Sequence, residues 1–251
     1  MLAALHDYSL ISLEALKARA SLLRRIDNKY VLTAKQLSDF LLAQAEDYSV
    51  LCIDGMRRFN YSSIYWDGSD YQTFFDHNKG RRRRFKIRFR HYHEAALYFF
   101  EIKIKGFRNE TVKYRQQTDK ANCYSDTLPP ALLSFANDKL VHHYGYQLTY
   151  TLQRSLRVDY QRTTLVAREN SERITIDHGI QFVEPDRHHA LAKTAYVVEV
   201  KSENGRSNAD LWLLRNGHRP LKACSKYGMG INILQFSDRN TRFRSLLRQR
   251  F

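Results

Sequence analysis

Cysteine is scarce in this sequence, and its three thiols are widely separated. Cys52, Cys123 and Cys224 form no CxxC pair and no combination with histidine at metal-ligand spacing. A structural zinc site and a disulfide framework both depend on such spacings, so neither is expected. Isolated thiols are typical of a reducing compartment, and we therefore predict a cytoplasmic location.

The sequence also lacks the motifs of common nucleotide and hydrolase sites. Neither GxxxxGK[ST] nor GxGxxG occurs, so a P-loop or Rossmann nucleotide site is not expected. No serine or cysteine stands in recognisable nucleophile surroundings, and the pair His188-His189 is too isolated to indicate a metal site. Any phosphate chemistry is therefore expected to rest on other residues.

Long apolar runs are missing as well. No stretch approaches the roughly 18 apolar residues that a membrane span needs. The first residues show neither the basic segment nor the apolar run of a signal peptide. We therefore expect a soluble protein with no transmembrane segment.

Acidic residues are few relative to basic ones. The chain has 26 Asp and Glu against 41 Lys and Arg, which gives a formal net charge of +15. This balance predicts an anionic partner: nucleic acid, a phosphate-rich small molecule or an acidic membrane surface. A hydrophobic fraction of 43% is sufficient for a core, and no repeat or linker divides the chain. We predict a single domain over residues 1–251, with a core at 20–235 and a basic C-terminal helix at 236–251.

Two neighbouring segments alternate strictly between charged and apolar residues. Segment 84–92 carries three cations on one parity, and segment 98–106 carries one carboxylate and two lysines on one parity. Successive side chains of a strand point to opposite faces, so each segment is predicted to be a strand with one charged face. The short separation between them suits an antiparallel hairpin. The charged residues are Lys86, Arg88, Arg90, Glu101, Lys103 and Lys105.

Charged residues recur at positions i and i+2 in later segments. They are Lys113 and Arg115, Arg173 with Thr175 and Asp177, and Glu199 with Lys201. A single strand of this kind would be interpreted as a solvated outer face, but the repetition favours a surface that faces inward. We predict an α+β fold: a closed antiparallel β-barrel tunnel of about eight strands, with helices packed on the outside. Its cationic interior would attract a polyanion and could also hold a divalent metal.

Eight short motifs of charged and aromatic residues follow one another through nearly the whole chain. They are Arg25-x-Asp27-x-Lys29-Tyr30, Ile64-Tyr-Trp-Asp67, Lys86-Ile-Arg88-x-Arg90, Glu101-x-Lys103, Tyr160-Gln-Arg162-Thr, Arg173-Ile-Thr-Ile-Asp177, Val198-Glu199-Val-Lys201 and Ser225-Lys226-Tyr-Gly228. Together they resemble the catalytic domain of the vacuolar transporter chaperone (VTC) family. That family is a branch of the triphosphate tunnel metalloenzymes, which are relatives of the CYTH proteins. The resemblance implies an eight-stranded antiparallel tunnel lined by basic residues, in agreement with the strand parity.

The resemblance implies polyphosphate synthesis, in which the γ-phosphate of ATP passes to a growing polyphosphate chain and ADP is released. The implied cofactor is Mn²⁺ or Mg²⁺, with Glu199 as principal metal ligand and Glu101 as a second candidate. The implied phosphate-binding residues are Lys29, Arg88, Arg90, Lys103, Arg162 and Lys226. Further tunnel residues that would contact substrate are Lys86, Lys105, Lys113, Arg115, Arg173, Lys201 and Ser225. Arginine and lysine suit this chemistry, because phosphoryl transfer depends mainly on positioning and on charge neutralisation.

Several neighbours of these residues are expected to have structural roles. Asp27 and Asp177 are predicted to be ion-pair partners that order the tunnel cations. Tyr30, Tyr65 and Tyr160 are predicted to be packing residues.

Two other functions stay open at this point. An inorganic triphosphatase of the same fold would use water as the phosphate acceptor. Lys103 replaces the second acidic residue of the ExExK pattern of the CYTH branch, which favours the polymerase. The other function is that of a non-catalytic protein that binds polyphosphate or RNA. RNA is the least expected ligand, because the aromatic residues are predicted to lie on the strand face opposite the cations. The sequence does not determine the oligomeric state.

Overall fold

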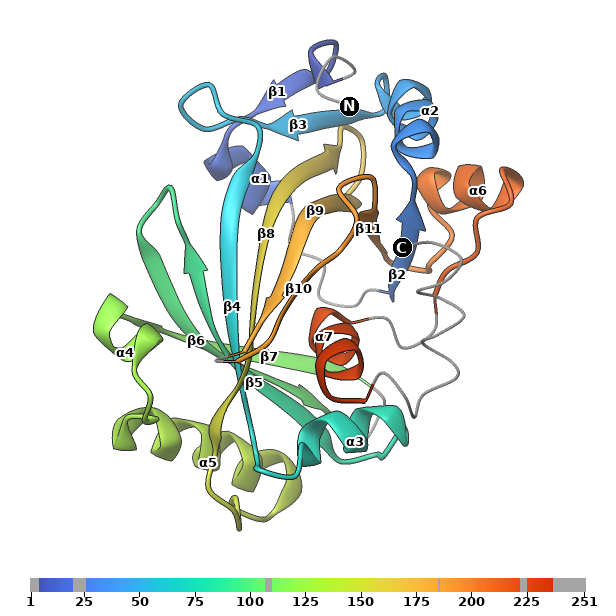
Figure 1. Cartoon of the computed structure of the whole chain (residues 1–251). Helices are drawn as coiled ribbons and strands as arrows, with labels where there is room; N and C mark the ends of the chain where they lie inside the picture. Colours follow the sequence, from blue (N-terminus) through green and yellow to red (C-terminus); the bar gives the residue numbers. More distant parts are fainter. Residues whose placement is uncertain (1–4, 20–25, 107–109, 185, 222–224, 237–251) are drawn as a thin grey trace.

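The computed structural model describes the chain except for residues 1–4, 20–25, 107–109, 185, 222–224 and 237–251. A large, mostly antiparallel sheet forms the centre of the molecule, and helices surround it (Figure 1). Three sequence features fall outside the described residues: Arg25 of the first motif, Cys224, and nearly all of the C-terminal helix expected at 236–251.

Eight strands follow one another by hydrogen bonding and form the main path of the sheet. In spatial order they are β2 (Ile26–Leu32), β11 (Tyr196–Ser202), β9 (Arg173–Val183), β8 (Gln153–Ala167), β4 (Phe59–Asp67), β5 (Arg84–Tyr92), β6 (Leu97–Lys105) and β7 (Thr111–Thr118). Three short strands extend this path: β1 (Ser9–Ile11) runs parallel to β3 (Tyr48–Leu51), β3 pairs with β8, and β10 (His188–Ala190) pairs with β9. The predicted α+β class with a large antiparallel sheet is confirmed.

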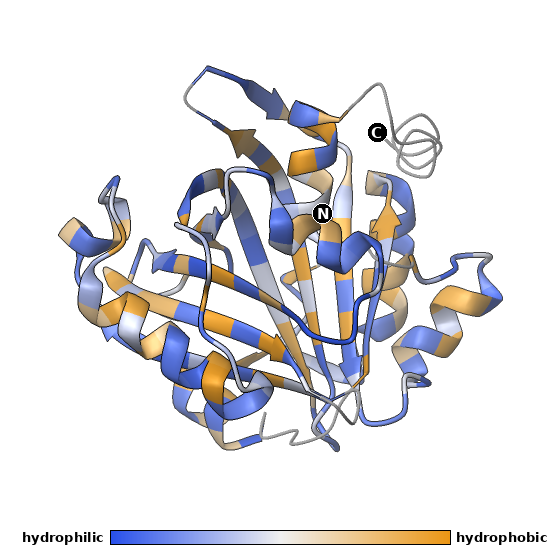
Figure 2. Ribbon diagram, turned by 90° about the horizontal axis from the view of Figure 1, so that it is seen from below, coloured by the Kyte–Doolittle hydropathy of each residue, from blue (hydrophilic) through white to orange (hydrophobic). Residues whose placement is uncertain are grey.

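The predicted hairpin of β5 and β6 brings charged residues together on one face. Lys86 lies opposite Lys103, and Arg88 lies opposite Glu101. β6 pairs in turn with β7, which places Lys113 opposite Lys103. Hydrophilic and hydrophobic residues alternate along the strands (Figure 2). We call the face that carries Arg88 and Lys103 the inner face, since directly paired residues share a face.

The described residues form seven helices. They are α1 (Leu13–Arg19), α2 (Ala34–Gln44), α3 (Gln72–Asn78), α4 (Lys120–Tyr124), α5 (Pro130–Tyr144), α6 (Asn208–Arg215) and α7 (Lys226–Gln235). Thr33 caps the N-terminus of α2, in a reciprocal capping box with Gln36. α5 begins at Pro130, where a missing N–H costs nothing, and ends at Gly145, whose φ of 76° suits glycine. No helix in the described ranges is both long and apolar enough to cross a lipid bilayer.

Most of the apolar strand residues point to the outer face, where helices bury them. α5 places Leu132, Ala136 and Leu140 against the apolar side chains of β4, β5 and β6. α2 and α6 cover β2, β9 and β11 in the same way. Removal of this apolar surface from water is the main term that stabilises the sheet.

α7 is an exception, because it packs on the inner face. Met229 and Ile231 of α7 belong to one core cluster with Leu156 of β8. Leu156 lies opposite Tyr65, which in turn lies opposite Arg88. The expectation that the helices pack on the outside is therefore wrong for α7. The inner face is charged along only part of its length, and α7 shields its apolar part from water.

The main path of the sheet is not closed by hydrogen bonds within the described residues. β2 and β7 are its two ends, and on this path they pair only with β11 and β6. The predicted closed barrel is therefore not confirmed. Strand parity indicates which face a side chain occupies, but closure depends on the tilt and stagger of all the strands together.

Candidate functional site

The inner face carries three carboxylates that are each held between two cations. The first is Glu101 on β6, which lies 2.7 Å from Arg88 on β5 and 2.5 Å from Lys113 on β7. Arg88 donates through both Nε and Nη2 to one carboxylate oxygen of Glu101. Because Glu101 is almost fully buried, it fixes the guanidinium in a single orientation on the inner face.

The second carboxylate is Glu199 on β11. It lies 3.2 Å from Lys29 on β2 and 2.8 Å from Lys201 on its own strand. The register places Lys29 directly opposite Glu199, so the pairing of β2 with β11 positions this contact. Of the three carboxylates, Glu199 has the most exposed side chain, at 16%.

The third carboxylate is Asp177 on β9. It accepts hydrogen bonds of 2.6 and 2.8 Å from Arg162 on β8. It also binds Lys226, the first residue of α7. Asp177 was predicted to be an ion-pair partner of tunnel cations, and these contacts confirm that role. The sequence did not indicate that α7 would supply Lys226 from above the sheet.

All three carboxylates stay ionised on the folded protein. Burial alone would raise the pKa of Glu101, Asp177 and Glu199, but the adjacent cations outweigh burial and lower the pKa of each. A carboxylate that keeps its charge continues to hold its lysine and arginine partners at physiological pH. The inner face therefore presents positioned cations before any ligand is bound.

Lys86 and Lys103 differ from the cations described so far. They lie opposite each other on β5 and β6, and the ion pairs among the described residues include neither. Lys86 donates instead to Oγ of Ser225 at 2.9 Å, and Ser225 caps α7. Burial and the charges of Lys103 and Lys29 lower the pKa of Lys86 to about 7. A bound anion would stabilise the charged form of such a lysine.

The inner face is concave, because adjacent residues at the start of α7 contact strands from distant parts of the main path. Ser225 accepts a hydrogen bond from Lys86 on β5, and Lys226 contacts Asp177 on β9. In the order of the sheet, β4 and β8 lie between β5 and β9.

Two tyrosines orient arginines on the inner face. Tyr160 accepts a hydrogen bond from Arg90, whose guanidinium lies 5.7 Å from the centre of the tyrosine ring. Tyr65 accepts one from Arg88 at 3.3 Å. The interpretation of both tyrosines as packing residues was incomplete, and the expectation that aromatic residues lie opposite the cations is wrong here. The alternation of side chains along β8 predicts that Tyr160 shares the face of Arg162, because the two residues are two positions apart.

The remaining predicted residues lie toward the margins of the inner face. Arg115 on β7 lies 4.7 Å from the ring centre of Phe99 on β6. Lys105 ends β6 and is half-buried, and Arg173 begins β9 opposite Lys201. Every residue predicted to bind phosphate or metal is thus placed on the inner face or at the start of α7.

The donor atoms of the inner face fit a divalent metal only in combination with phosphate oxygens. The described residues contain no group of three or more His, Cys, Asp or Glu side chains that could hold a metal by themselves. Mg²⁺ and similar ions often take one or two carboxylates and complete their shell with phosphate and water. Both glutamates lie between two cations, but the Glu199 side chain is 16% exposed and that of Glu101 only 2%. The geometry therefore favours Glu199 over Glu101 as a metal ligand.

Comparison with known proteins gives one family and several related folds. A family model described as VTC domain matches residues 24–235. A candidate adenylate cyclase of Bacillus halodurans is 13% identical with a TM-score of 0.50, and the match covers 77% of this chain and 89% of that chain. A candidate adenylyl cyclase of Hippeastrum is described as having a dominant triphosphatase activity. It is 14% identical with a TM-score of 0.49, and the match covers 82% of this chain and 94% of that chain. No curated protein matches the chain. The first of these structures supports the fold.

Proposed function

The chain belongs to the VTC domain family, and on this basis we propose that it is a metal-dependent polyphosphate polymerase. It transfers the γ-phosphoryl group of ATP to the end of an inorganic polyphosphate chain and releases ADP. The observation that best supports this is the pair Lys86 and Lys103, which lie opposite each other on a concave cationic face without a carboxylate ion pair among the described residues. Phosphate oxygens would supply the anionic partners of both lysines.

The proposed transfer requires positioning more than proton transfer. The terminal phosphate of the acceptor chain is anionic near neutral pH, so its oxygen attacks the γ-phosphorus without a general base. A new P–O bond forms as the bond from the β,γ-bridging oxygen to the γ-phosphorus breaks, and its electron pair leaves with ADP. Arg88 and Arg90, oriented by Glu101 and Tyr160, would hold the reacting phosphate in line. Their fixed charges would stabilise the transition state without reorganisation.

Glu199 would hold Mn²⁺ or Mg²⁺ jointly with phosphate oxygens. When bound, such an ion neutralises charge on the transferred phosphate. Lys29 and Lys201 keep the Glu199 side chain on the inner face, where arriving phosphates would meet it.

A polymeric substrate is best served by an enclosed path, and the proposal includes a tunnel over the inner face. The bridge from β5 through Ser225 and Lys226 to Asp177 on β9 supports this.

The direct test is incubation of the purified chain with ATP and Mn²⁺. Products are resolved on a gel stained for polyphosphate, while ADP and free phosphate are quantified. Long chains with an equivalent amount of ADP are expected. Free phosphate without polymer, above all from added tripolyphosphate, would identify a triphosphatase instead. Tight binding of polyphosphate with neither product would identify a non-catalytic binder.

The variant Glu199→Gln tests the proposed metal ligand. Loss of the carboxylate charge should lower the rate of ADP release about 100-fold or more, while the circular dichroism spectrum stays unchanged. Glu203→Gln is the matched control, because Glu203 follows β11 and is exposed. Full activity of Glu199→Gln would remove the role that we assign to this residue.

A further inference from the structure

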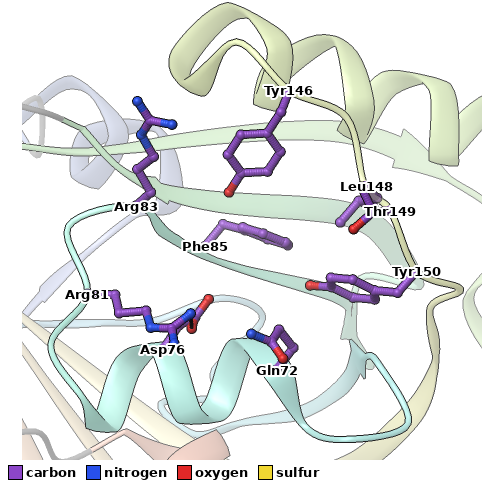
Figure 3. Close-up of a pocket in the computed structure, with 9 residues that line it drawn as sticks. All are labelled: Gln72, Asp76, Arg81, Arg83, Phe85, Tyr146, Leu148, Thr149 and Tyr150. Carbon is purple, nitrogen blue, oxygen red and sulfur yellow. Dashed lines mark ion pairs between the residues drawn. The ribbon is translucent and has the colours of Figure 1, made fainter.

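A cavity lies outside the inner face, next to α3 and the start of β5 (Figure 3). Its volume is about 520 Å³, which falls in the range of roughly 300–1,000 Å³ that is common for small-molecule sites. Phe85 lines this cavity, whereas the next residue, Lys86, lies on the inner face. β5 therefore separates the cavity from the proposed phosphate site.

Aromatic rings form one part of the cavity wall. Phe85, Tyr146 and Tyr150 all face it in Figure 3. The ring of Tyr146 stacks on Tyr144, with centroids 5.6 Å apart and planes at 21°, yet Tyr146 remains 37% exposed. Tyr150 packs closely over Gly68, where an added Cβ would come within 2.9 Å of its ring. Tyr146 and Tyr150 are therefore held in place, and the exposed ring of Tyr146 can stack with a planar ligand.

A buried carboxylate and an amide lie on the opposite side of the cavity. Oδ1 of Asp76 pairs with Nη1 of Arg81 at 3.0 Å, and 14% of the Asp76 side chain remains exposed. Gln72 lies one turn earlier on α3 and also lines the cavity. The two side chains offer an acceptor for an amino group and an amide for ring nitrogens, which together suit the edge of a purine.

Positive charge gathers at the rim of the cavity. Arg81 and Arg83 both line it, and they belong to the run of four arginines at 81–84. Arg83 lies beside Tyr146 in Figure 3, so a cationic and an aromatic group adjoin each other. A ligand that meets both would carry an anionic group close to a planar ring.

We propose that this cavity binds a purine nucleotide. The base stacks against Tyr146, its amino group donates to Asp76, and its phosphate binds Arg83. The site is separate from the inner face and does not depend on the proposed polymerase activity. An inorganic phosphate chain would leave the aromatic rings unused and would be repelled by Asp76, so the lining favours the nucleotide.

The first measurement is calorimetric titration of AMP into the full chain in the presence of saturating tripolyphosphate. Tripolyphosphate has no base and would occupy the inner face. AMP that still binds in its presence is therefore expected to occupy the cavity beside α3. Absence of AMP binding, or its loss when tripolyphosphate is added, would overturn the proposal.

Four variants then locate the AMP that binds. Arg83→Ala and Tyr146→Ala should each weaken AMP binding at least about tenfold, whereas Tyr146→Phe should stay within about twofold because it keeps the ring. Arg82→Ala is the matched control, because Arg82 is an exposed neighbour that does not line the cavity. Arg83 and Tyr146 are exposed, so all variants are expected to fold, as circular dichroism can verify. Equal affinity in all four variants would place AMP elsewhere and overturn the site.

Discussion

At the scale of single residues, the inner face combines cations that are ion-paired with carboxylates and cations that, among the described residues, are not. Arg88 and Arg162 each donate two hydrogen bonds to one carboxylate, so their orientation is set in the absence of ligand. Among the described residues Lys86 has no carboxylate partner, and burial together with neighbouring cations lowers its pKa to about 7. Its charge state near neutral pH is therefore expected to depend on what is bound.

Binding of tripolyphosphate is predicted to take up protons at pH 8 through Lys86. An unperturbed lysine has a pKa of 10.5, so between pH 7 and 10.5 the unfolded chain holds a proton that the folded chain lacks at Lys86. The contribution of Lys86 to stability therefore rises with pH through this window. A bound phosphate favours the charged form instead, and its affinity should fall as the pH rises. Calorimetry in two buffers with different ionisation enthalpies measures the uptake.

Lys86→Arg is the matched variant for this prediction. Arginine stays protonated throughout this range, so the variant should show less proton uptake and a flatter pH dependence. Some uptake is expected to remain, because burial also lowers the pKa of Lys113 and Lys201 to about 8. Unchanged uptake in Lys86→Arg would show that Lys86 does not titrate on binding.

At the scale of secondary structure, α7 connects the charged and apolar parts of the inner face. Its first residues contact Lys86 and Asp177, and its remaining length buries apolar strand residues. The hydroxyl of Tyr227 on α7 donates a hydrogen bond of 2.6 Å to the carboxylate of Asp67 at the end of β4. The same carboxylate accepts the backbone N–H of Thr73 at 2.9 Å in α3. One buried carboxylate therefore ties two helices to the sheet.

Tyr227→Phe is predicted to lower the free energy of unfolding by about 1–2 kcal/mol, because a buried carboxylate loses a donor while the packing volume is kept. Urea unfolding followed by circular dichroism measures this change. Affinity for tripolyphosphate should also fall, since Ser225 and Lys226 depend on the position of α7. Tyr146→Phe removes an exposed hydroxyl and is the control. Equal stability of Tyr227→Phe and the native chain would show that the hydrogen bond from Tyr227 to Asp67 does not stabilise the fold.

At the scale of the whole molecule, the chain concentrates positive charge that its own acidic residues do not balance. The formal net charge is +15, and the inner face places Lys86 next to further cations. Repulsion between like charges destabilises the compact state, and a polyanion would relieve it. Stability and ligand binding are therefore expected to be coupled.

Tripolyphosphate is predicted to raise the thermal midpoint of unfolding in a saturable way. At 100 times its dissociation constant, a ligand that binds only the folded state contributes about 2.7 kcal/mol. Differential scanning calorimetry measures the shift, with sodium chloride at equal ionic strength as the control for screening. An equal shift in sodium chloride would mean that screening alone is responsible.

Local patterns in the sequence predicted the parts of the structure that depend on local physics. Alternation over 84–92 and 98–106 predicted the hairpin and the face of each cation. The position of α7 was not predicted, because its apolar residues do not indicate which surface of the sheet they will cover. The nucleotide cavity was also not foreseen, since Asp76 and Tyr146 are far apart in the sequence.

The sequence by itself determined the hairpin of β5 and β6, the antiparallel class and the cations and carboxylates of the inner face, because alternation along a strand is a property of neighbouring residues. The tertiary structure alone decided which carboxylate holds which cation, where α7 packs, and that Lys86 and Lys103 face each other without a carboxylate ion pair among the described residues. Those features depend on the register and curvature of strands that are distant along the chain.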